Sequence, residues 1–206
     1  MKFYMTPGSC TTGIHILLEE LELVFEVHLV NLLAGDQDTA AYRALNPKGT
    51  IPTLVRDDGT ALTDFVAIAW WLARNWPKRG LLPDDGEEQA RVLEVMNHAV
   101  GTVHGQGFAR IFTTDKFTPS PADHAAVKAR GREIVEQGFA VMNDALDGRD
   151  YAVGDRFTIA DAALFYVEFW ATRSDVPLPP HCLAHYTRML TRRAVRQVLA
   201  EEGYRV

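Results

Sequence analysis

Cys10 is one of only two cysteines in this chain of 206 residues, and it follows the short segment Pro7, Gly8 and Ser9. The apolar residues 2–5 predict a short strand, which the proline and glycine end, so a helix should begin near Cys10. The N–H groups and the dipole at the start of a helix stabilise an anion, including a thiolate. Cys10 is therefore either a nucleophilic thiolate or a small apolar residue packed in the core, as most free cysteines are.

The residues around Cys10 limit the chemistry that its thiolate could perform. The next three residues, TTG, supply no second cysteine, so Cys10 cannot close a local disulfide. Its natural oxidised product is a mixed disulfide with a small thiol. The hydroxyl groups of Ser9, Thr11 and Tyr4 are close enough in the sequence to assist or replace the thiol.

Alternating strand-like and helix-like segments in residues 1–76 must position these groups. In the segment 25–30, Phe25, Val27 and Leu29 alternate with polar residues, which predicts a half-buried strand. The expected order is βαβαββα, with strands at residues 2–5, 25–30 and on both sides of the DDG turn at 57–59, and helices at 11–23, 38–45 and 64–76.

Strand signals largely vanish after residues 77–86, which hold two prolines and two glycines and are the expected linker. Residues 87–206 then follow helical patterns: a long stretch at 87–112 that glycines could bend, another at 120–146, and shorter ones nearer the C-terminus. Thr158 and Asp161 have the spacing of a capping box at a helix start. The sequence predicts an α/β first domain (1–76) and an all-helical second domain (87–206).

The composition is that of a folded, soluble protein, with 47% hydrophobic and 23% charged residues and a net charge of −6. An acidic chain is a poor partner for nucleic acid, and no apolar run reaches the roughly 18 residues of a membrane span. We expect no secretory signal at the N-terminus and no disulfide framework from two distant cysteines. We therefore expect a cytoplasmic protein with no nucleic-acid or membrane partner.

Several segments in order resemble a known family. They are PGSC after the first strand, NPKGTIPTL, DDGTALTD before VAIAWWLA, GF in the first long helix of the second half, and YAVGDRFTIADAALF near the C-terminus. The chain resembles a bacterial, cysteine-type (beta-class-like) glutathione transferase. The resemblance implies a thioredoxin-like first domain and an all-α second domain. It also implies a homodimer, glutathione as co-substrate on the first domain, and a hydrophobic electrophile in the cleft between domains.

The resemblance implies roles for particular residues of the first domain. Cys10 would face the glutathione sulfur, and Thr50, Ile51 and Pro52 would hold its peptide backbone through a cis Ile51–Pro52 bond; a strand-edge proline is the alternative. Asp64 would hold the γ-glutamyl ammonium, and it would also cap the helix that follows.

The chain departs from the family pattern at the next residue. Phe65 stands where a small residue usually lets a glutathione carboxylate approach backbone N–H groups. Lys48 is the only lysine between residues 3 and 77, and relatives often carry further lysines in that stretch.

In the second domain, the resemblance implies that His104 faces the catalytic cysteine. The run His104–Phe108 is one residue longer than in relatives, and one residue rotates a helical position by about 100°. Either His104 keeps its role after a local adjustment, or Gln106 reaches the site instead. The resemblance places Trp170 near the hydrophobic co-substrate pocket, and Phe108 and Phe112 could line the same wall. Alternatively, these three aromatic residues form ordinary core.

Two other clusters are expected to have no catalytic role. His181, Cys182 and His185 are spaced as metal ligands can be, but no paired cluster accompanies them, so we expect no metal. The arginines between residues 188 and 196 are expected to form a solvated or interface face.

Two functions fit the sequence. The first is an enzyme that conjugates glutathione to hydrophobic electrophiles or exchanges mixed disulfides through Cys10. The second is a non-catalytic relative that binds a hydrophobic ligand or a partner in the cleft, which Phe65 and the missing lysines would favour.

Overall fold

The computed structural model describes residues 1–205. The chain divides into two compact units, one formed by Met1–Leu82 with the C-terminal residues from Leu190 onward, the other by Pro83–Met189. The sequence pattern predicts that all of residues 87–206 form the second domain, whereas the last helix packs with the first unit. Apolar helical periodicity shows that a helix buries one face but not which domain it packs against.

The first unit contains a mixed sheet of four strands in the order β2-β1-β3-β4. Strand β1 (Lys2–Met5) pairs in parallel with β2 (Glu26–Leu29) and antiparallel with β3 (Thr53–Val55), which pairs antiparallel with β4 (Ala61–Thr63). The helices are α1 (Thr11–Glu20), α2 (Ala40–Leu45) and α3 (Phe65–Asn75), so the predicted order βαβαββα and the thioredoxin-like topology are confirmed. Short 3₁₀ turns lie at Asp36–Asp38 and Pro77–Arg79.

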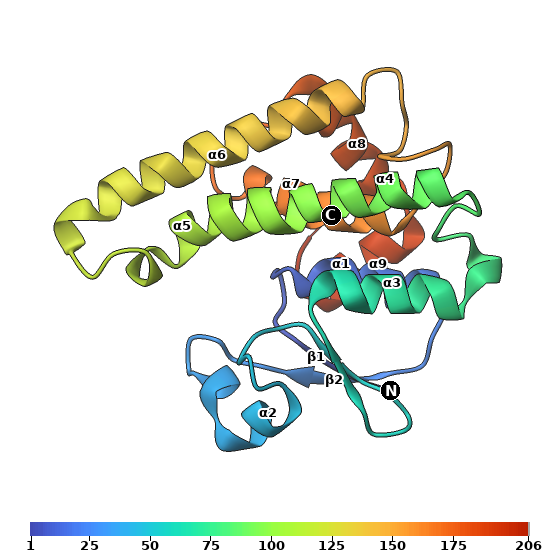
Figure 1. The fold of residues 1–206 in the computed structure, drawn as a ribbon, viewed down its shortest axis with the longest axis horizontal. Helices are drawn as coiled ribbons and strands as arrows, with labels where there is room; N and C mark the ends of the chain where they lie inside the picture. The colour runs from blue at the N-terminus through green and yellow to red at the C-terminus, as the bar shows by residue number, and fades with distance from the viewer. Residues whose placement is uncertain (206) are drawn as a thin grey trace. The chain divides into compact units, whose positions relative to one another are not determined.

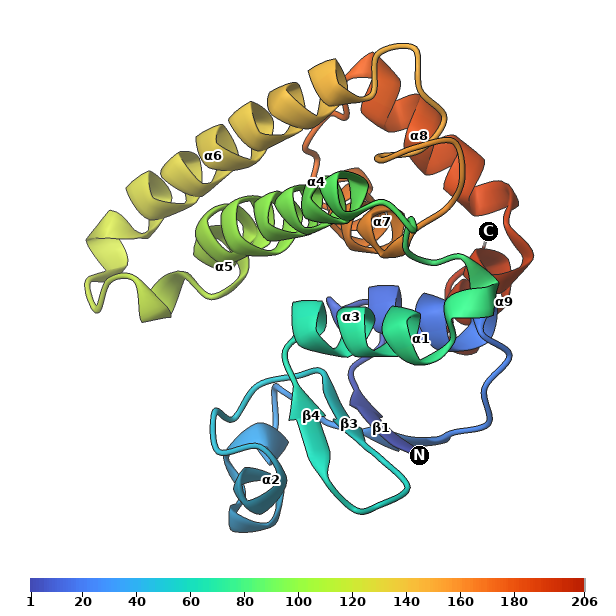
Figure 2. The same ribbon diagram turned by 45° about the vertical axis from the view of Figure 1, so that its right-hand side comes forward.

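Helices α1 and α3 lie side by side over one face of the sheet, and α2 lies on the other side (Figures 1 and 2). Helix α9 (Arg193–Glu201) packs against α1. The core between sheet and helices is apolar, and Phe3, Ile14, Leu17 and Ile68 are fully buried within it.

Strand β2 differs from the expected half-buried pattern. The side chains of Val27 and Leu29 are 44% and 69% exposed, while His28 stacks on Tyr4 with ring centroids 4.6 Å apart. β2 is the outer strand of the sheet and pairs with β1 alone, so its alternating side chains have no strand beside them on one edge. The sequence pattern showed the strand but not its place in the sheet.

The second unit is helical throughout its regular structure. Its main helices are α4 (Gly86–Asn97), α6 (His124–Ala145), α7 (Ile159–Thr172) and α8 (Pro180–Thr191), and short 3₁₀ turns lie at Thr114–Lys116 and Pro121–Asp123. Thr158 and Asp161 form the predicted capping box at the start of α7, whose residues 159–171 are all buried. No helix among the described residues is long and apolar enough to cross a membrane.

The predicted long helix 87–112 contains a stretch of a different helical type. Between α4 and α5 (Ala109–Phe112), the segment η3 (His98–Phe108) is a π-helix, and the three continue one another along α6 (Figure 1). A Cβ atom on Gly107 would lie 2.5 Å from the Val135 side chain, so glycine is required for η3 and α6 to approach this closely.

Candidate active site

Cys10 lies at the position predicted from the sequence, one residue before α1. The turn before it depends on Gly8, which has a φ of 71° and would place a Cβ atom 1.9 Å from the Tyr204 hydroxyl. The backbone N–H of Gly8 donates a hydrogen bond of 2.7 Å to Glu202 on the C-terminal side of α9. The approach of the C-terminal segment thus explains the glycine before Cys10.

The Cys10 thiol is buried and faces a carbonyl group. Its side chain is 7% exposed, and its S–H donates to the Ile51 carbonyl with an S···O distance of 3.6 Å. Burial raises the pKa of Cys10 to about 12, although hydrogen bonds from its own backbone and from Ser9 lower it in part. The thiolate expected from the helix N-terminus is therefore not the resting form, because desolvation outweighs the local N–H groups.

The Ile51–Pro52 peptide bond is cis, as the resemblance implied. The carbonyl of Thr50 just before it accepts hydrogen bonds of 2.7 Å from Tyr42 Oη and from Asn46 Nδ2. Both donors are buried, so they fix the turn that presents the Ile51 carbonyl to Cys10. Sequence reasoning named Thr50, Ile51 and Pro52 but missed Tyr42 and Asn46, and the Asn-Pro start of NPKG was the available signal.

Asp64 precedes α3 and has a φ of 75°, a backbone region that non-glycine residues seldom adopt and that concentrates at functional sites. Its side chain makes no capping hydrogen bond, which corrects the expectation of a helix cap. The carboxylate instead forms a 2.5 Å ion pair with Lys48. Burial is the main cause of the raised pKa of the Cys10 thiol, and the negative charge of Asp64 raises it further. The neighbouring Phe65 is 3% exposed, so its ring belongs to packed structure rather than to open ligand space.

The candidate residues of the second unit form one aromatic cluster. The ring centroid of Trp170 lies 4.8 Å from that of His104, 5.4 Å from Phe108 and 5.3 Å from Phe112. His104 Nδ1 lies 3.2 Å from the Tyr166 hydroxyl, a partner that the sequence analysis missed. Burial lowers the pKa of His104 to about 4, so this imidazole is neutral near pH 7.

The extra residue in the His104–Phe108 run lies within the π-helix. A π-helix closes i→i+5 hydrogen bonds, so it accommodates an added residue without turning all later side chains out of register. His104 and Phe108 both stay in the cluster, whereas Gln106 is exposed. His104, and not Gln106, therefore lies in the aromatic cluster.

The three residues spaced like metal ligands near α8 have separate structural partners. Cys182 donates its S–H to the Phe139 carbonyl, and His181 Nδ1 lies 3.0 Å from the Asn143 carbonyl. His185 lies between two buried carboxylates, with Nδ1 2.8 Å from Glu168 and Nε2 3.2 Å from Asp161.

The fold agrees with comparisons to known proteins. Residues 8–75 match the glutathione S-transferase N-terminal domain, and residues 125–188 match the C-terminal domain. The glutathione S-transferase GstA of Escherichia coli O157:H7 is 35% identical over 98% of this chain and 99% of its own length.

Solved structures give the same result. A glutathione transferase homologue from Sulfitobacter with bound glutathione is 25% identical, has a TM-score of 0.89 and covers 97% of each chain. The beta-class enzyme of Sphingomonas chungbukensis is 27% identical, with a TM-score of 0.84 over 98% of this chain and 99% of that one.

This chain therefore belongs to the glutathione S-transferase family. Within the family it is similar to bacterial members, beta-class enzymes among them, so the predicted family, thioredoxin-like first domain and helical second domain are confirmed.

Proposed function

We propose that this protein is a glutathione transferase that conjugates glutathione to hydrophobic electrophiles. Family membership and the glutathione held by its Sulfitobacter relative support glutathione as co-substrate. The proposal rests on the contact between the Cys10 thiol and the Ile51 carbonyl at the cis Ile51–Pro52 turn. The charge of Asp64 also raises the pKa of the same thiol. The non-catalytic alternative is not favoured, because the relatives are transferases and Phe65 is packed away from open space.

Protonated Cys10 supplies a hydrogen-bond donor rather than a nucleophile. A glutathione thiolate beside Cys10 would accept the S–H that now points to Ile51, and this bond would stabilise the anion. The glutathione sulfur then bonds to the electrophilic carbon, the leaving group departs with its electron pair, and the glutathione thiol proton passes to solvent. This role makes conjugation the favoured reaction and disulfide exchange, which needs a Cys10 thiolate, the lesser one.

Asp64 and Lys48 provide opposite charges for the ends of glutathione. Their ion pair is well exposed, with side chains 60% and 48% accessible, and such pairs contribute about 0–1 kcal/mol. The ammonium of glutathione can therefore replace Lys48 at Asp64 at little cost, which releases Lys48 to meet a carboxylate of the ligand.

The aromatic cluster of the second unit is the proposed binding surface for the electrophile. Phe112 is 51% exposed and stacks on buried Phe108, so an apolar ring has one accessible aromatic face to pack on. Neutral His104 contributes a polar nitrogen without a charge to desolvate.

We also propose a cytoplasmic homodimer with a role in detoxification. Two free, buried cysteines suit a reducing compartment, and the dimer and the detoxifying role are what the family resemblance implies.

The test measures glutathione conjugation to an aryl halide by the wild type and by Cys10→Ser, Cys10→Ala and Cys182→Ala variants. A donor role predicts that Cys10→Ser keeps much of the activity, since a hydroxyl also donates, and that Cys10→Ala loses about tenfold or more. Cys182→Ala is the matched control and should retain activity. Equal loss in Cys10→Ser and Cys10→Ala would contradict the donor role, and no turnover with retention on immobilised glutathione would favour the binding protein.

A further inference from the structure

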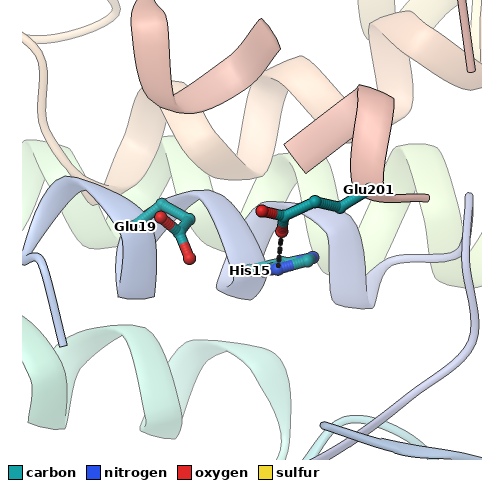
Figure 3. A group of neighbouring side chains, drawn as sticks. All are labelled: His15, Glu19 and Glu201. Carbon is teal, nitrogen blue, oxygen red and sulfur yellow. Dashed lines mark ion pairs between the residues drawn. The ribbon is translucent and has the colours of Figure 1, made fainter. Parts of the chain in front are cut away.

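An unassigned cluster of ligating side chains lies between α1 and α9, both in the first unit. His15 and Glu19 stand one turn apart on α1, and Glu201 comes from the end of α9 (Figure 3). One ligand atom from each residue lies within 4.8 Å of the other two. The proposed transferase reaction uses none of these residues.

The imidazole of His15 has one nitrogen engaged and one without a hydrogen bond. Its side chain is only 4% exposed, and Nδ1 lies 3.0 Å from Glu202 Oε1. Nε2 is buried and lacks a hydrogen-bond partner, although Glu201 Oε2 lies 3.2 Å away (Figure 3). A buried polar nitrogen without a hydrogen bond is rare in proteins, and this one faces a carboxylate oxygen at a distance that leaves room for a shared ion.

Glu202 fixes the orientation of the ring. Its carboxylate is buried, and its Oε2 accepts hydrogen bonds of 2.7 Å from Gly8 N and from Thr12 Oγ1, while its Oε1 lies 3.0 Å from His15 Nδ1. Because Nδ1 faces this carboxylate, Nε2 is the nitrogen available to a cation. A carboxylate that orients a histidine through its other nitrogen is a common feature of metal sites.

Gln197 holds the two remaining carboxylates in place. Its Nε2 donates to Glu19 Oε2 at 2.9 Å and to Glu201 Oε1 at 3.0 Å. The second oxygen of each carboxylate is thus left for another partner. The Glu201 side chain is 47% exposed, so an ion can reach this carboxylate from solvent.

The charges and spacing suit a divalent ion. Three carboxylates, those of Glu19, Glu201 and Glu202, lie beside His15, and the charge of Arg193 acts on Glu19 as well. Zinc ligands lie about 2.0–2.2 Å from the ion, so the 3.2 Å between His15 Nε2 and Glu201 Oε2 corresponds to an angle of about 100° at the metal. One imidazole with two carboxylates is a donor set for borderline first-row metals rather than for calcium or magnesium.

We propose that His15, Glu19 and Glu201 bind a divalent transition-metal ion of the zinc type, which ties α9 to α1. The sequence predicts no metal, because His181, Cys182 and His185 have no paired cluster beside them, and His15 and Glu201 are separated by more than 180 residues and meet only after folding. Since Glu202 also holds Gly8 and Thr12, the ion would steady the segment that carries Cys10.

The experiment titrates metal-free full-length protein with ZnCl₂ and follows heat of binding and melting temperature, with CoCl₂ absorption as a second readout. The wild type should bind one equivalent and melt at a higher temperature with zinc. Glu19→Gln and Glu201→Gln should each weaken zinc binding by about tenfold or more and abolish the rise in melting temperature. Both side chains are partly accessible, so the variants should fold, which circular dichroism checks.

The matched control is Glu20→Gln, which removes the same charge from the next residue of α1, where the carboxylate pairs with Arg192. This variant should bind zinc as the wild type does, and so should a Cys10→Ala/Cys182→Ala protein, which lacks thiol ligands. The proposal is overturned if the wild type takes up no zinc at about 1 mM. It is also overturned if Glu19→Gln and Glu201→Gln bind zinc normally, or if Glu20→Gln loses binding to the same extent.

Discussion

At the scale of single residues, the burial of Cys10 decides which reaction its sulfur can serve. The helix start and the Ser9 hydroxyl lower the pKa of the thiol, yet loss of hydration raises it more. A protonated S–H beside the cis Ile51–Pro52 turn suits hydrogen-bond donation to a bound thiolate. If its sulfur were more exposed, the cysteine of the same PGSC motif would be a nucleophilic thiolate.

The pH dependence of Cys10 alkylation measures the protonation state of this thiol directly. Because burial raises the pKa of Cys10 to about 12, the rate of its reaction with iodoacetamide should climb with pH and reach no plateau below about pH 10. The Cys182→Ala protein isolates Cys10, and the same protein in denaturant should show a midpoint near the ordinary thiol value of about 8.5. A plateau near neutral pH would show that Cys10 is an activated thiolate.

Asp64 offers a second test at this scale. Asp64→Asn should raise the KM for glutathione by about 10–100-fold, the loss expected for one charge-assisted hydrogen bond, and leave kcat nearly unchanged. Asparagine has the size and shape of aspartate, so the substitution removes the charge and little else. Steady-state kinetics with varied glutathione measures the effect.

Asp58→Asn in the turn before β4 is the matched control for Asp64, since its amide oxygen can still accept from Thr60. An unchanged KM in Asp64→Asn, or a fall in kcat alone, would exclude Asp64 from glutathione binding.

At the scale of elements, helix type and helix ends place the groups of the second unit. The π-helical turns of η3 absorb an added residue and keep His104 beside Trp170. The start of α7 is fixed by the Thr158–Asp161 capping box, and Asp161 also joins a buried network with His185 and Glu168. Removing one partner of such a network costs about 3–5 kcal/mol.

The buried network predicts how stability depends on pH. Burial lowers the pKa of His185, but Glu168 and Asp161 together outweigh it and raise that pKa to about 10, while burial raises the pKa of Glu168 to about 7. Both groups hold protons more tightly in the folded state than in the unfolded one. The stability they contribute is therefore present at low pH and is lost as pH rises towards the folded values.

Urea unfolding between about pH 7.5 and 9 tests this, because His104, whose low pKa acts in the opposite direction, is then deprotonated in both the folded and the unfolded protein. The free energy of unfolding should fall with rising pH in the wild type. His185→Gln should be less stable by about 3–5 kcal/mol at the lower pH and should lose most of the slope. An equal slope in both proteins would assign the pH dependence to other groups.

At the scale of the whole molecule, the C-terminal helix is part of the first unit. Val195, Val198 and Leu199 of α9 are buried, and Glu202 just beyond it accepts hydrogen bonds from Gly8 and Thr12 on either side of Cys10. The first 82 residues are therefore not an independent glutathione-binding domain.

A truncation that ends at Thr191 should accordingly abolish retention on immobilised glutathione and make residues 1–82 sensitive to trypsin, while residues 83–189 stay protected. Deleting only the last two residues is the control and should leave both properties intact, since Tyr204 and Glu202 remain. Retention by the shorter protein would show that α9 is dispensable.

The sequence alone determined the order of elements, the capping box and the segments that identify the family, while the cis Ile51–Pro52 bond was implied only by the family resemblance. These depend on local turn chemistry, on hydrophobic period and on residues close together in the chain. Cys10, Asp64, His104 and the aromatic residues of the candidate site were also recognisable from the sequence, because each lies in or beside one of those segments.

Only the tertiary structure decided the rest. The protonation of Cys10, the Lys48 partner of Asp64, the exposed face of β2 and the meeting of His15 with Glu201 depend on which segments approach one another. Desolvation and ion pairing act through space, between residues that the chain separates by up to nearly its full length, so no local pattern in the sequence records them.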